Sequence, residues 1–259
     1  LSNDDGIRAP SLEVLGEMLV PLGEVWVVAP ERDQSAVSHS VTLRSPLRMR
    51  QLRRGWYAVD GTPTDCIMMA IHHVLNGSKP DLVIAGVNEG GNIGEDVVYS
   101  GTVSAAMEAT LYGIPALAVS LVGREPYQHR MAATVTAHLA EFFLRHWLRP
   151  DTFLNINIPN MPASTLRGVK VTRQGKRILG ESVVEKVDPR GEKYYWLAAY
   201  GPGWEEGEDT DFAAVRDGYI SVTPLKIDLT DYDTFGSLAG MVAEIEVASL
   251  RSLGEEACR

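Results

Sequence analysis

Residues 81–102 read Asp-Leu-Val-Ile-Ala-Gly-Val-Asn-Glu-Gly-Gly-Asn-Ile-Gly-Glu-Asp-Val-Val-Tyr-Ser-Gly-Thr. An apolar run opens this stretch, a polar and glycine-rich cluster over 86–94 follows it, and Ser100-Gly101-Thr102 marks the start of a helix. A buried strand, a polar turn and a helix in this order form the repeating unit of a parallel α/β sheet. The same order recurs on both sides of the stretch, so it decides the fold class.

Strand and helix patterns alternate along the first 160 residues. Short apolar runs predict strands over 25–29, 81–87, 115–121 and 153–158, and an alternating pattern predicts a hairpin over 41–59. Apolar residues at helical spacing predict helices over 10–20, 62–75, 100–112 and 127–148. Thr62 is the expected N-cap of the second helix, with Pro63 at its first position and Asp65 three residues after the cap. These patterns predict an α/β fold with a mostly parallel sheet.

The pattern changes after Asn160. Strands are predicted at 169–173 and 194–197, and charged loops such as 188–191 and 205–211 separate them. Segments of this kind often pack on a neighbouring subunit or form a lid. Because no internal repeat or linker divides the chain, we predict one α/β domain over 1–259. Its catalytic core is expected over about 1–160 and a C-terminal part, used as a lid or for oligomerisation, over about 161–259.

The composition limits the classes of partner. Of the 259 residues 45% are hydrophobic and 22% charged, and the formal net charge is −10. Since nucleic-acid binding normally needs a basic face, this charge argues against a nucleic-acid polymer as partner. The sequence has no apolar run of about 18 residues and no signal-peptide pattern. We therefore expect a cytoplasmic protein without a membrane partner.

The cysteines and the start of the chain carry further expectations. Cys66 and Cys258 are the only cysteines, and they indicate neither a disulfide framework nor a cysteine zinc site. Leu1-Ser2 is too short to be the first strand that the following residues require. We expect that a few apolar residues of that strand precede Leu1 in the native gene product.

Polar side chains follow three of the predicted strands. Asp4 and Asp5, within Asn3-Asp4-Asp5-Gly6, come after the first strand, Ser35 lies in the loop after the second, and Asn88 follows the strand over 81–87. In a doubly wound sheet, ligands bind beyond the carboxyl ends of the strands. Two carboxylates, a hydroxyl and an amide oxygen suit Mg²⁺ or Mn²⁺ and leave open positions for water or phosphate. The sequence therefore predicts a divalent metal site.

Each of these motifs also has a purely structural interpretation. Asn3-Asp4-Asp5-Gly6 can be a turn with Gly6 at positive φ; Ser35 can be a solvated loop residue, and Asn88 can cap a turn. Asn92 can belong to an ordinary flexible loop. Ser100, Gly101 and Thr102 can form a helix cap, an anion-binding helix end, or both together. We interpret Thr62–Asp65 mainly as a cap.

Missing motifs argue against several enzyme classes. The chain has no G-x-x-x-x-G-K-[ST], no G-x-G-x-x-G, no G-x-S-x-G and no H-E-x-x-H pattern. The adjacent aspartates differ from the Asp-x-Asp expected of an aspartyl-phosphate mechanism, so they favour metal-activated water. A dinucleotide-binding or non-catalytic Rossmann module and a covalent aspartyl phosphatase are the alternatives.

Several longer stretches resemble one known family. They are Ser-Asn-Asp-Asp-Gly-Ile at 2–7, Val-Ala-Pro-Glu-Arg at 28–32, Gly-Thr-Pro-Thr-Asp-Cys at 61–66, the cluster 86–94, Tyr-Ser-Gly-Thr-Val-Ser-Ala-Ala-Met-Glu at 99–108, and segments at 154–159, 188–191, 210–215 and 218–225. Together they resemble the SurE (survival protein E) family of metal-dependent 5′/3′-nucleotidases over essentially the whole chain. The family commonly has glycine after the serine ligand, where this chain has Ala36.

The resemblance implies a fold and a site. It implies a Rossmann-like three-layer α/β/α fold and a homodimer or homotetramer in which C-terminal elements are exchanged. The implied metal ligands are Asp4, Asp5, Ser35 and Asn88, which would hold one divalent ion, Mg²⁺ or Mn²⁺, per subunit.

The resemblance also implies an activity, the hydrolysis of nucleoside 5′- and 3′-monophosphates. Asp4 or Asp5 would accept a proton from the attacking water. Asn92 and the N–H groups of Ser100, Gly101 and Thr102 would bind the phosphate. The preferred base, the phosphate position, the physiological metal, cleavage of short polyphosphate and the choice between dimer and tetramer stay open at this point.

Overall fold

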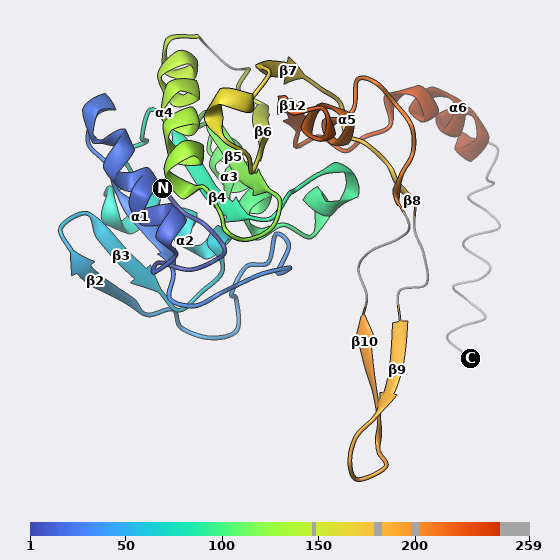
Figure 1. The fold of residues 1–259 in the computed structure, drawn as a ribbon, viewed down its shortest axis with the longest axis horizontal. Helices are drawn as coiled ribbons and strands as arrows, with labels where there is room; N and C mark the ends of the chain where they lie inside the picture. The colour runs from blue at the N-terminus through green and yellow to red at the C-terminus, as the bar shows by residue number, and fades with distance from the viewer. Residues whose placement is uncertain (147–148, 179–182, 198–202, 244–259) are drawn as a thin grey trace. The chain divides into compact units, whose positions relative to one another are not determined.

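The computed structural model describes residues 1–146, 149–178, 183–197 and 203–243 (Figure 1). The chain divides into two compact units, Leu1–Ile227 and Asp228–Arg259, and each is described by itself. The described part of the second unit contains the helix α6 (Tyr232–Ala243). No helix among the described residues has the length and apolar character needed to cross a bilayer. All the residues predicted to form the site belong to the first unit.

Helices and strands alternate along the first unit. The α-helices are α1 (Pro10–Leu19), α2 (Pro63–Met69), α3 (Gly101–Leu111), α4 (His129–Arg145) and α5 (Asp211–Arg216). The strands of the two larger sheets are β1 (Val27–Pro30), β2 (Met49–Arg53), β3 (Trp56–Val59), β4 (Val83–Glu89), β5 (Ala116–Val122), β6 (Thr152–Pro159), β7 (Val169–Val171) and β12 (Ile220–Lys226).

The elements predicted over the first 160 residues are confirmed, with some differences in their limits. The hairpin predicted over 41–59 occupies only the second half of that range, as β2 and β3. The helix predicted over 62–75 continues beyond α2 as a π-helix, Ala70–Val74. The end of the helix predicted over 127–148 lies outside the described residues, and α4 itself ends at Arg145.

Leu1 and Ser2 join two sheets. One sheet has the order β1-β3-β2 and the other the order β4-β5-β6-β12-β7, in which β4, β5 and β6 are parallel. The N–H of Val28 in β1 donates to the Leu1 carbonyl at 3.0 Å, and that of Gly86 in β4 donates to the Ser2 carbonyl at 2.8 Å. These two residues therefore lie between β1 and β4 as a short strand, here called the seam strand, and Asp4 and Asp5 follow its carboxyl end.

Alternate side chains of the central strands face opposite helix layers. On β5, Leu117, Val119 and Leu121 pack in a cluster with α1 and α4, whereas Ala116 and Ala118 pack in a cluster with α2 and α3. This alternation is the period of two that a strand imposes on its side chains. Full burial of one large apolar side chain contributes about 1.5–3 kcal/mol. The three layers confirm the predicted Rossmann-like α/β/α architecture.

Local capping explains where two of the helices begin. The Thr62 hydroxyl accepts from the Asp65 N–H at 3.1 Å, and the Asp65 carboxylate accepts from the Thr62 N–H at 2.9 Å, which completes a capping box for α2. The Ser100 hydroxyl accepts from the Val103 N–H at 3.0 Å and caps α3. Both caps confirm the sequence-based assignment.

Residues beyond 160 contribute to the central sheet and to two smaller ones. Strand β12 pairs antiparallel with β6 and parallel with β7. Strand β8 (Arg177–Ile178) pairs antiparallel with β11 (Gly203–Trp204), and β9 (Val183–Val187) forms a hairpin with β10 (Lys193–Leu197). The single domain over 1–259, and the roles predicted for 1–160 and 161–259, stay predictions.

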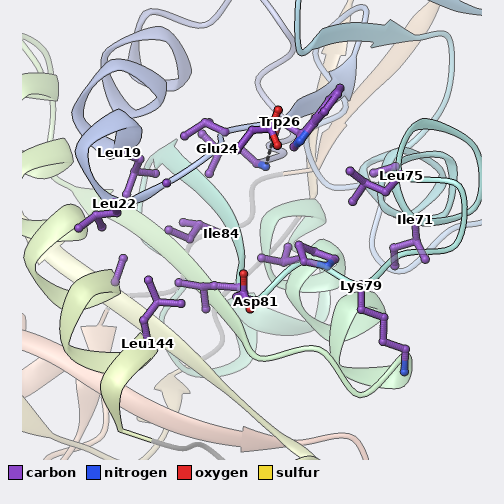
Figure 2. Close-up of a pocket in the computed structure, with 18 of the residues that line it drawn as sticks. Leu19, Leu22, Glu24, Trp26, Ile71, Leu75, Lys79, Asp81, Ile84 and Leu144 are labelled. Atoms are coloured by element: carbon purple, nitrogen blue, oxygen red, sulfur yellow. Dashed lines mark hydrogen bonds between the residues drawn. The ribbon is translucent and has the colours of Figure 1, made fainter.

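A mostly apolar cavity of about 310 Å³ opens beside Leu1, at the amino ends of β1 and β4 (Figure 2). Leu19, Ile71 and Leu144 are among the side chains that line it. The backbone nitrogen of Leu1 donates to the Trp26 carbonyl at 2.6 Å. Because Asp4 and Asp5 follow the opposite end of the seam strand, this cavity is separate from the candidate site.

Gly94 connects the glycine-rich loop to the segment around β8 and β11. Its φ of +55° lies in the left-handed region that favours glycine. A Cβ at this position would lie 2.5 Å from the Trp204 ring and 2.6 Å from the carbonyl oxygen of Gly175. The residue therefore has to be glycine both for its backbone conformation and for the space around it.

Replacement of Gly94 by alanine is expected to lower the free energy of unfolding by about 2–5 kcal/mol. The left-handed backbone accounts for about 1–2 kcal/mol and steric overlap for about 1–3 kcal/mol. Gly77→Ala is the matched control, because Gly77 has φ +81° and, its chain neighbours aside, no atom of the described residues lies within 4 Å of the added Cβ. Urea denaturation measures both variants. Equal losses for the two would contradict the packing of Trp204 against Gly94.

Candidate active site

The Asp4 carboxylate is buried against the first turn of α3. Thr102 donates to it twice, from its hydroxyl to Oδ1 and from its backbone N–H to Oδ2 at 3.2 Å. The absence of a side chain at Gly101 allows this approach, because a Cβ there would lie 2.9 Å from the Cβ of Asp4. Burial raises the pKa of Asp4, and the hydrogen bonds from Thr102 oppose that rise. The positive end of the α3 dipole thus faces a carboxylate of the same chain.

Asp5 carries a buried oxygen without a hydrogen bond. Among the described residues, its Oδ2 atom has no hydrogen-bond partner. Burial, followed by the charges of Asp4 and Glu89, raises the pKa of Asp5 to about 7, although the backbone N–H of Glu89 acts in the opposite direction. Two adjacent carboxylates that are both withdrawn from water resist ionisation together. A cation beside them would remove this penalty.

The turn interpretation of residues 3–6 is also confirmed. The Asn3 side chain donates to the Gly6 carbonyl at 3.0 Å, and Gly6 has φ +97°. The backbone carbonyl of Asp4 accepts from the Gln34 N–H at 2.8 Å. The turn and the carboxylate pair therefore coexist, because the turn is what directs two consecutive aspartates away from the seam strand.

Ser35 lies in the loop that follows β1, directly after the contact between Gln34 and Asp4. Its hydroxyl donates to Asp33 Oδ1 at 2.6 Å, and its N–H donates to the same oxygen at 2.7 Å. The side chain is exposed, so the solvated-loop interpretation describes its surroundings. The contact at Gln34 is what keeps this loop beside Asp4, and the role of Ser35 as a metal ligand stays a prediction.

The loop that carries Ser35 is held at its far end by the cap of α2. The Asp65 carboxylate accepts from the Thr42 N–H at 2.9 Å and from the Thr42 hydroxyl at 2.6 Å, in addition to capping α2. Ser38 donates from its N–H to the Tyr99 carbonyl at 3.0 Å. Sequence reasoning identified Asp65 as a cap and missed its second contact, because Thr42 is distant in the sequence.

Asn88 lies near the carboxyl end of β4. Its side-chain N–H donates to the Gly90 carbonyl at 2.8 Å, which is the turn-capping interaction considered from the sequence. The side-chain oxygen, which is the metal-binding atom of an amide, takes no part in this bond. Asn88 therefore has the capping role and retains a ligand atom, and its role at a metal stays a prediction.

Asn92 is buried in a polar network on the sheet. Its side chain donates to the Ser120 hydroxyl at 2.7 Å. Its backbone carbonyl accepts from Asn155 at 2.7 Å and from Asn157 at 3.0 Å, and its N–H donates to the Asn157 side chain at 2.9 Å. The network holds the glycine-rich loop against β5 and β6. The contact of Asn92 with phosphate stays a prediction.

Asn155 and Asn157 were missed by sequence reasoning, although a signal exists. The segment Phe153-Leu154-Asn155-Ile156-Asn157-Ile158 places asparagine at alternate positions of an apolar strand. Both asparagines are fully buried. Since buried amides need hydrogen-bond partners, this alternation indicates a polar contact on one face of the strand.

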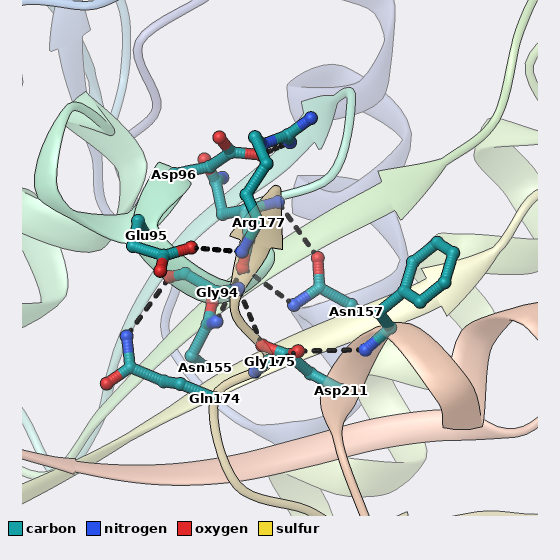
Figure 3. A network of polar contacts seen from close by, with 11 residues as sticks. Gly94, Glu95, Asp96, Asn155, Asn157, Gln174, Gly175, Arg177 and Asp211 are labelled. Carbon is teal, nitrogen blue, oxygen red and sulfur yellow. Dashed lines mark hydrogen bonds and ion pairs between the residues drawn. The ribbon is translucent and has the colours of Figure 1, made fainter. Parts of the chain in front are cut away.

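Asp211 attaches the later part of the unit to the glycine-rich loop (Figure 3). Its carboxylate accepts from the N–H groups of Gly94 at 2.8 Å and Gly175 at 2.7 Å. Burial raises the pKa of Asp211, and these hydrogen bonds act in the opposite direction. Arg177 pairs with Asp96 and donates from its N–H to Glu95 at 2.8 Å. Residues beyond 160 thus fix one side of the loop that begins with Asn88.

The donor set of the site fits a hard divalent cation. In the part of the chain that the structure describes, no three His, Cys, Asp or Glu side chains gather as a metal-binding group. A cation here would therefore rely on the two aspartates with neutral oxygen ligands, a set that Mg²⁺ and Mn²⁺ accept. The unpartnered Oδ2 atom of Asp5 is the structural observation that favours a bound cation.

Comparison with known proteins identifies the family. The model of the family described as Survival protein SurE matches residues 1–181. A protein named 5′-nucleotidase SurE from Geotalea uraniireducens (strain Rf4) is 51% identical over 239 residues, which cover 92% of this chain and 96% of that protein. The chain belongs to the SurE family. A protein of the same name from Pelobacter propionicus is 52% identical over 233 residues, 90% of this chain and 94% of that protein.

A SurE crystal structure shares the fold. The SurE protein from Aquifex aeolicus superposes with a TM-score of 0.85 at 46% sequence identity, covering 93% of this chain and 97% of that one. Membership of the SurE family confirms the resemblance inferred from the motifs, and the superposition confirms the α/β fold class. These matches favour neither the dinucleotide-binding module nor the covalent aspartyl phosphatase.

Divalent-metal affinity is expected to fall as the pH drops below about 7. The pKa of Asp5 is raised to about 7 in the metal-free protein, so a proton competes with the cation below that pH. Each further pH unit then costs up to about tenfold in affinity, and no such loss is expected above pH 8. Calorimetric titration with Mn²⁺ at pH 6 and pH 8 measures the difference. Equal dissociation constants would contradict a role for Asp5 in metal binding.

Proposed function

We propose that the protein is a metal-dependent 5′-nucleotidase, a phosphomonoesterase of nucleoside monophosphates. The relatives named 5′-nucleotidase SurE, about half identical over nine-tenths of the chain, support this function. The observation that carries it is a pair of adjacent carboxylates: Asp4 is buried against the amino end of α3, and half-buried Asp5 has an Oδ2 atom without a hydrogen-bond partner among the described residues. Such a pair can hold a cation where a helix end favours an anion.

The residues divide the chemistry among them. Asp4 and Asp5, with Ser35 and Asn88, would hold one Mg²⁺ or Mn²⁺ ion. When bound, such an ion supplies Lewis acidity toward a phosphate oxygen and lowers the pKa of a coordinated water. Thr102 fixes the Asp4 carboxylate in one orientation by two hydrogen bonds. Both Asp4 oxygens accept hydrogen bonds from Thr102, so Asp5 is the carboxylate assigned to accept a proton from the attacking water.

Phosphate binding is assigned to the start of α3 and to Asn92. Ser100, Gly101 and Thr102 begin the helix, whose free N–H groups attract an anion. The Thr102 N–H donates to Asp4 and the Val103 N–H donates to the Ser100 hydroxyl, so the phosphate contact is assigned to the backbone N–H groups of Ser100 and Gly101. Removal of one phosphate-stabilising donor typically costs about 10²–10³ in rate.

Asp5→Asn is expected to abolish hydrolysis of AMP in the presence of Mn²⁺ or Mg²⁺ while the fold is retained. The neutral amide removes one of the two charges that hold the cation. Asp81→Asn is the matched control, because Asp81 is an exposed aspartate before the opposite end of β4. Phosphate release from a panel of nucleotides and tripolyphosphate, with and without EDTA, measures the effect. Full activity of folded Asp5→Asn, or of wild-type protein in EDTA, would overturn the metal assignment.

The hairpin of β9 and β10 supports a homo-oligomer, a dimer or a tetramer. Both strands are exposed, with apolar side chains on each: Val183, Val184, Val187, Tyr194, Tyr195, Trp196 and Leu197. A two-stranded hairpin alone is at best marginally stable in water, and a large exposed apolar patch marks an interaction site. We assign the hairpin to contact with a second copy of the chain.

Trp196→Glu is expected to reduce the oligomer to a smaller species. A buried charge in the contact would cost several kcal/mol of association energy. The control is Val20→Glu at the end of α1. Val20 is an apolar residue that is 63% exposed, similar to the 65% of Trp196, but it lies outside the hairpin. Sedimentation velocity measures both. An unchanged mass for Trp196→Glu, or a monomeric wild-type protein, would contradict the assignment.

A further inference from the structure

A second pocket lies beside the carboxylate pair. Its volume is about 600 Å³, within the range of about 300–1,000 Å³ usual for ligand pockets. The lining residues come from the start of α1, the end of β4 and the segment between β5 and α4: Pro10, Glu89, Glu125, Pro126, Tyr127 and His129. These segments all follow carboxyl ends of neighbouring parallel strands, which is where ligands bind in open α/β sheets.

The pocket is continuous with the candidate active site through Glu89. This residue directly follows Asn88, and its backbone N–H forms a hydrogen bond with the Asp5 carboxylate. Its side chain is within ion-pair distance of His129, with 2.8 Å between Oε1 and Nε2. Glu89 thus lies between the carboxylate pair and the aromatic side of the pocket, so a ligand reaching from one to the other would pass along it.

The chemistry of the lining suits a neutral, hydroxylated aromatic ligand. Tyr127 and His129 are stacked, with ring centroids 6.0 Å apart and an angle of 22° between the planes. Tyr127 is half-buried against the core cluster of α1 and α4, which holds the ring in place. Glu89 and Glu125 add carboxylates, while Lys and Arg are missing among the described lining residues. Such a wall repels phosphate but accepts hydrogen bonds from hydroxyl groups.

We propose that this pocket binds the nucleoside part of the substrate. The base packs on the aromatic pair Tyr127–His129, and ribose hydroxyls donate to Glu89 and Glu125. Carboxylates contact ribose hydroxyls in this way in dinucleotide-binding folds. The proposal rests on the proposed nucleotidase function and deepens it, since it names the residues that distinguish a nucleotide from other phosphomonoesters.

The residue before the cap of α3 offers an alternative position for the base. Tyr99 precedes the Ser100 cap, and 64% of its surface is exposed. It lies beside the loop that carries Ser35, because its carbonyl accepts from the Ser38 N–H. The pocket is favoured because it brings aromatic and carboxylate groups together beside Asp5, whereas the Tyr99 ring is largely surrounded by solvent.

The test compares kcat/KM for AMP with kcat/KM for methyl phosphate, which has no base or ribose. Stacking of one base on an aromatic side chain is worth about 1–3 kcal/mol, which corresponds to about 5–150-fold. In Tyr127→Ala the ratio of the two kcat/KM values is therefore expected to fall about tenfold or more, mainly through a higher KM for AMP. Tyr127→Phe keeps the ring and should keep the ratio, and Tyr99→Ala should leave it at the wild-type value.

Three results would overturn the proposal, and they are distinguishable. If Tyr127→Ala lowers both kcat/KM values equally, the residue has only a structural role. If Tyr99→Ala lowers the ratio and Tyr127→Ala does not, the base binds at Tyr99 and not in the pocket. If the wild-type protein hydrolyses neither compound with Mn²⁺ or Mg²⁺, the nucleotidase function itself is wrong. Thermal unfolding of each variant confirms that the comparison is between folded proteins.

Discussion

The carboxylates of two consecutive residues, buried Asp4 and half-buried Asp5, are the constraint on which the site in the first unit depends. Withdrawing both from water raises the pKa of each, so the fold must supply compensation. Asp4 receives it from the amino end of α3 through Thr102, at a distance that the absence of a side chain at Gly101 permits. Asp5 keeps an oxygen that has no hydrogen-bond partner in the described part of the chain. Because Asp4 has hydrogen-bond donors and one oxygen of Asp5 does not, a cation bound beside Asp5 would supply the missing compensation.

The position of the pair depends on the seam strand. Leu1 and Ser2 bond on one side to β1 and on the other to β4, so the residues that follow them emerge where two sheets meet. The loop with Ser35 and the end of β4 with Asn88 flank the same point. Contacts from distant segments hold both of these loops in place. The hydrogen bond between Thr42 and Asp65 holds the loop with Ser35, and that between Gly94 and Asp211 holds the loop that begins with Asn88.

The two faces of the sheet give the proposed substrate two different surroundings. Toward α2 and α3, a helix end and hydrogen-bond donors favour the phosphate. Toward α1 and α4, the pocket with Tyr127 and Glu89 favours an uncharged aromatic group. The net charge of −10 is compatible with an anionic substrate, because the groups that would face the phosphate differ from those that face the rest of the substrate. Negative side chains line the nucleoside pocket, while the helix dipole and a cation would attract the phosphate.

The sequence by itself determined the order of elements, the start of α2 and α3, and the family. Hydrophobic periodicity and capping depend on residues three or four positions apart, so a linear pattern contains them. The four candidate ligands could also be named, because strand ends follow from the same periodicity. The sequence could not predict that Thr102 holds Asp4, that Asn157 holds Asn92, or that β12 pairs with both β6 and β7. Only the tertiary structure decided these, because each contact joins segments about 50–100 residues apart, and their meeting depends on how the whole sheet is assembled.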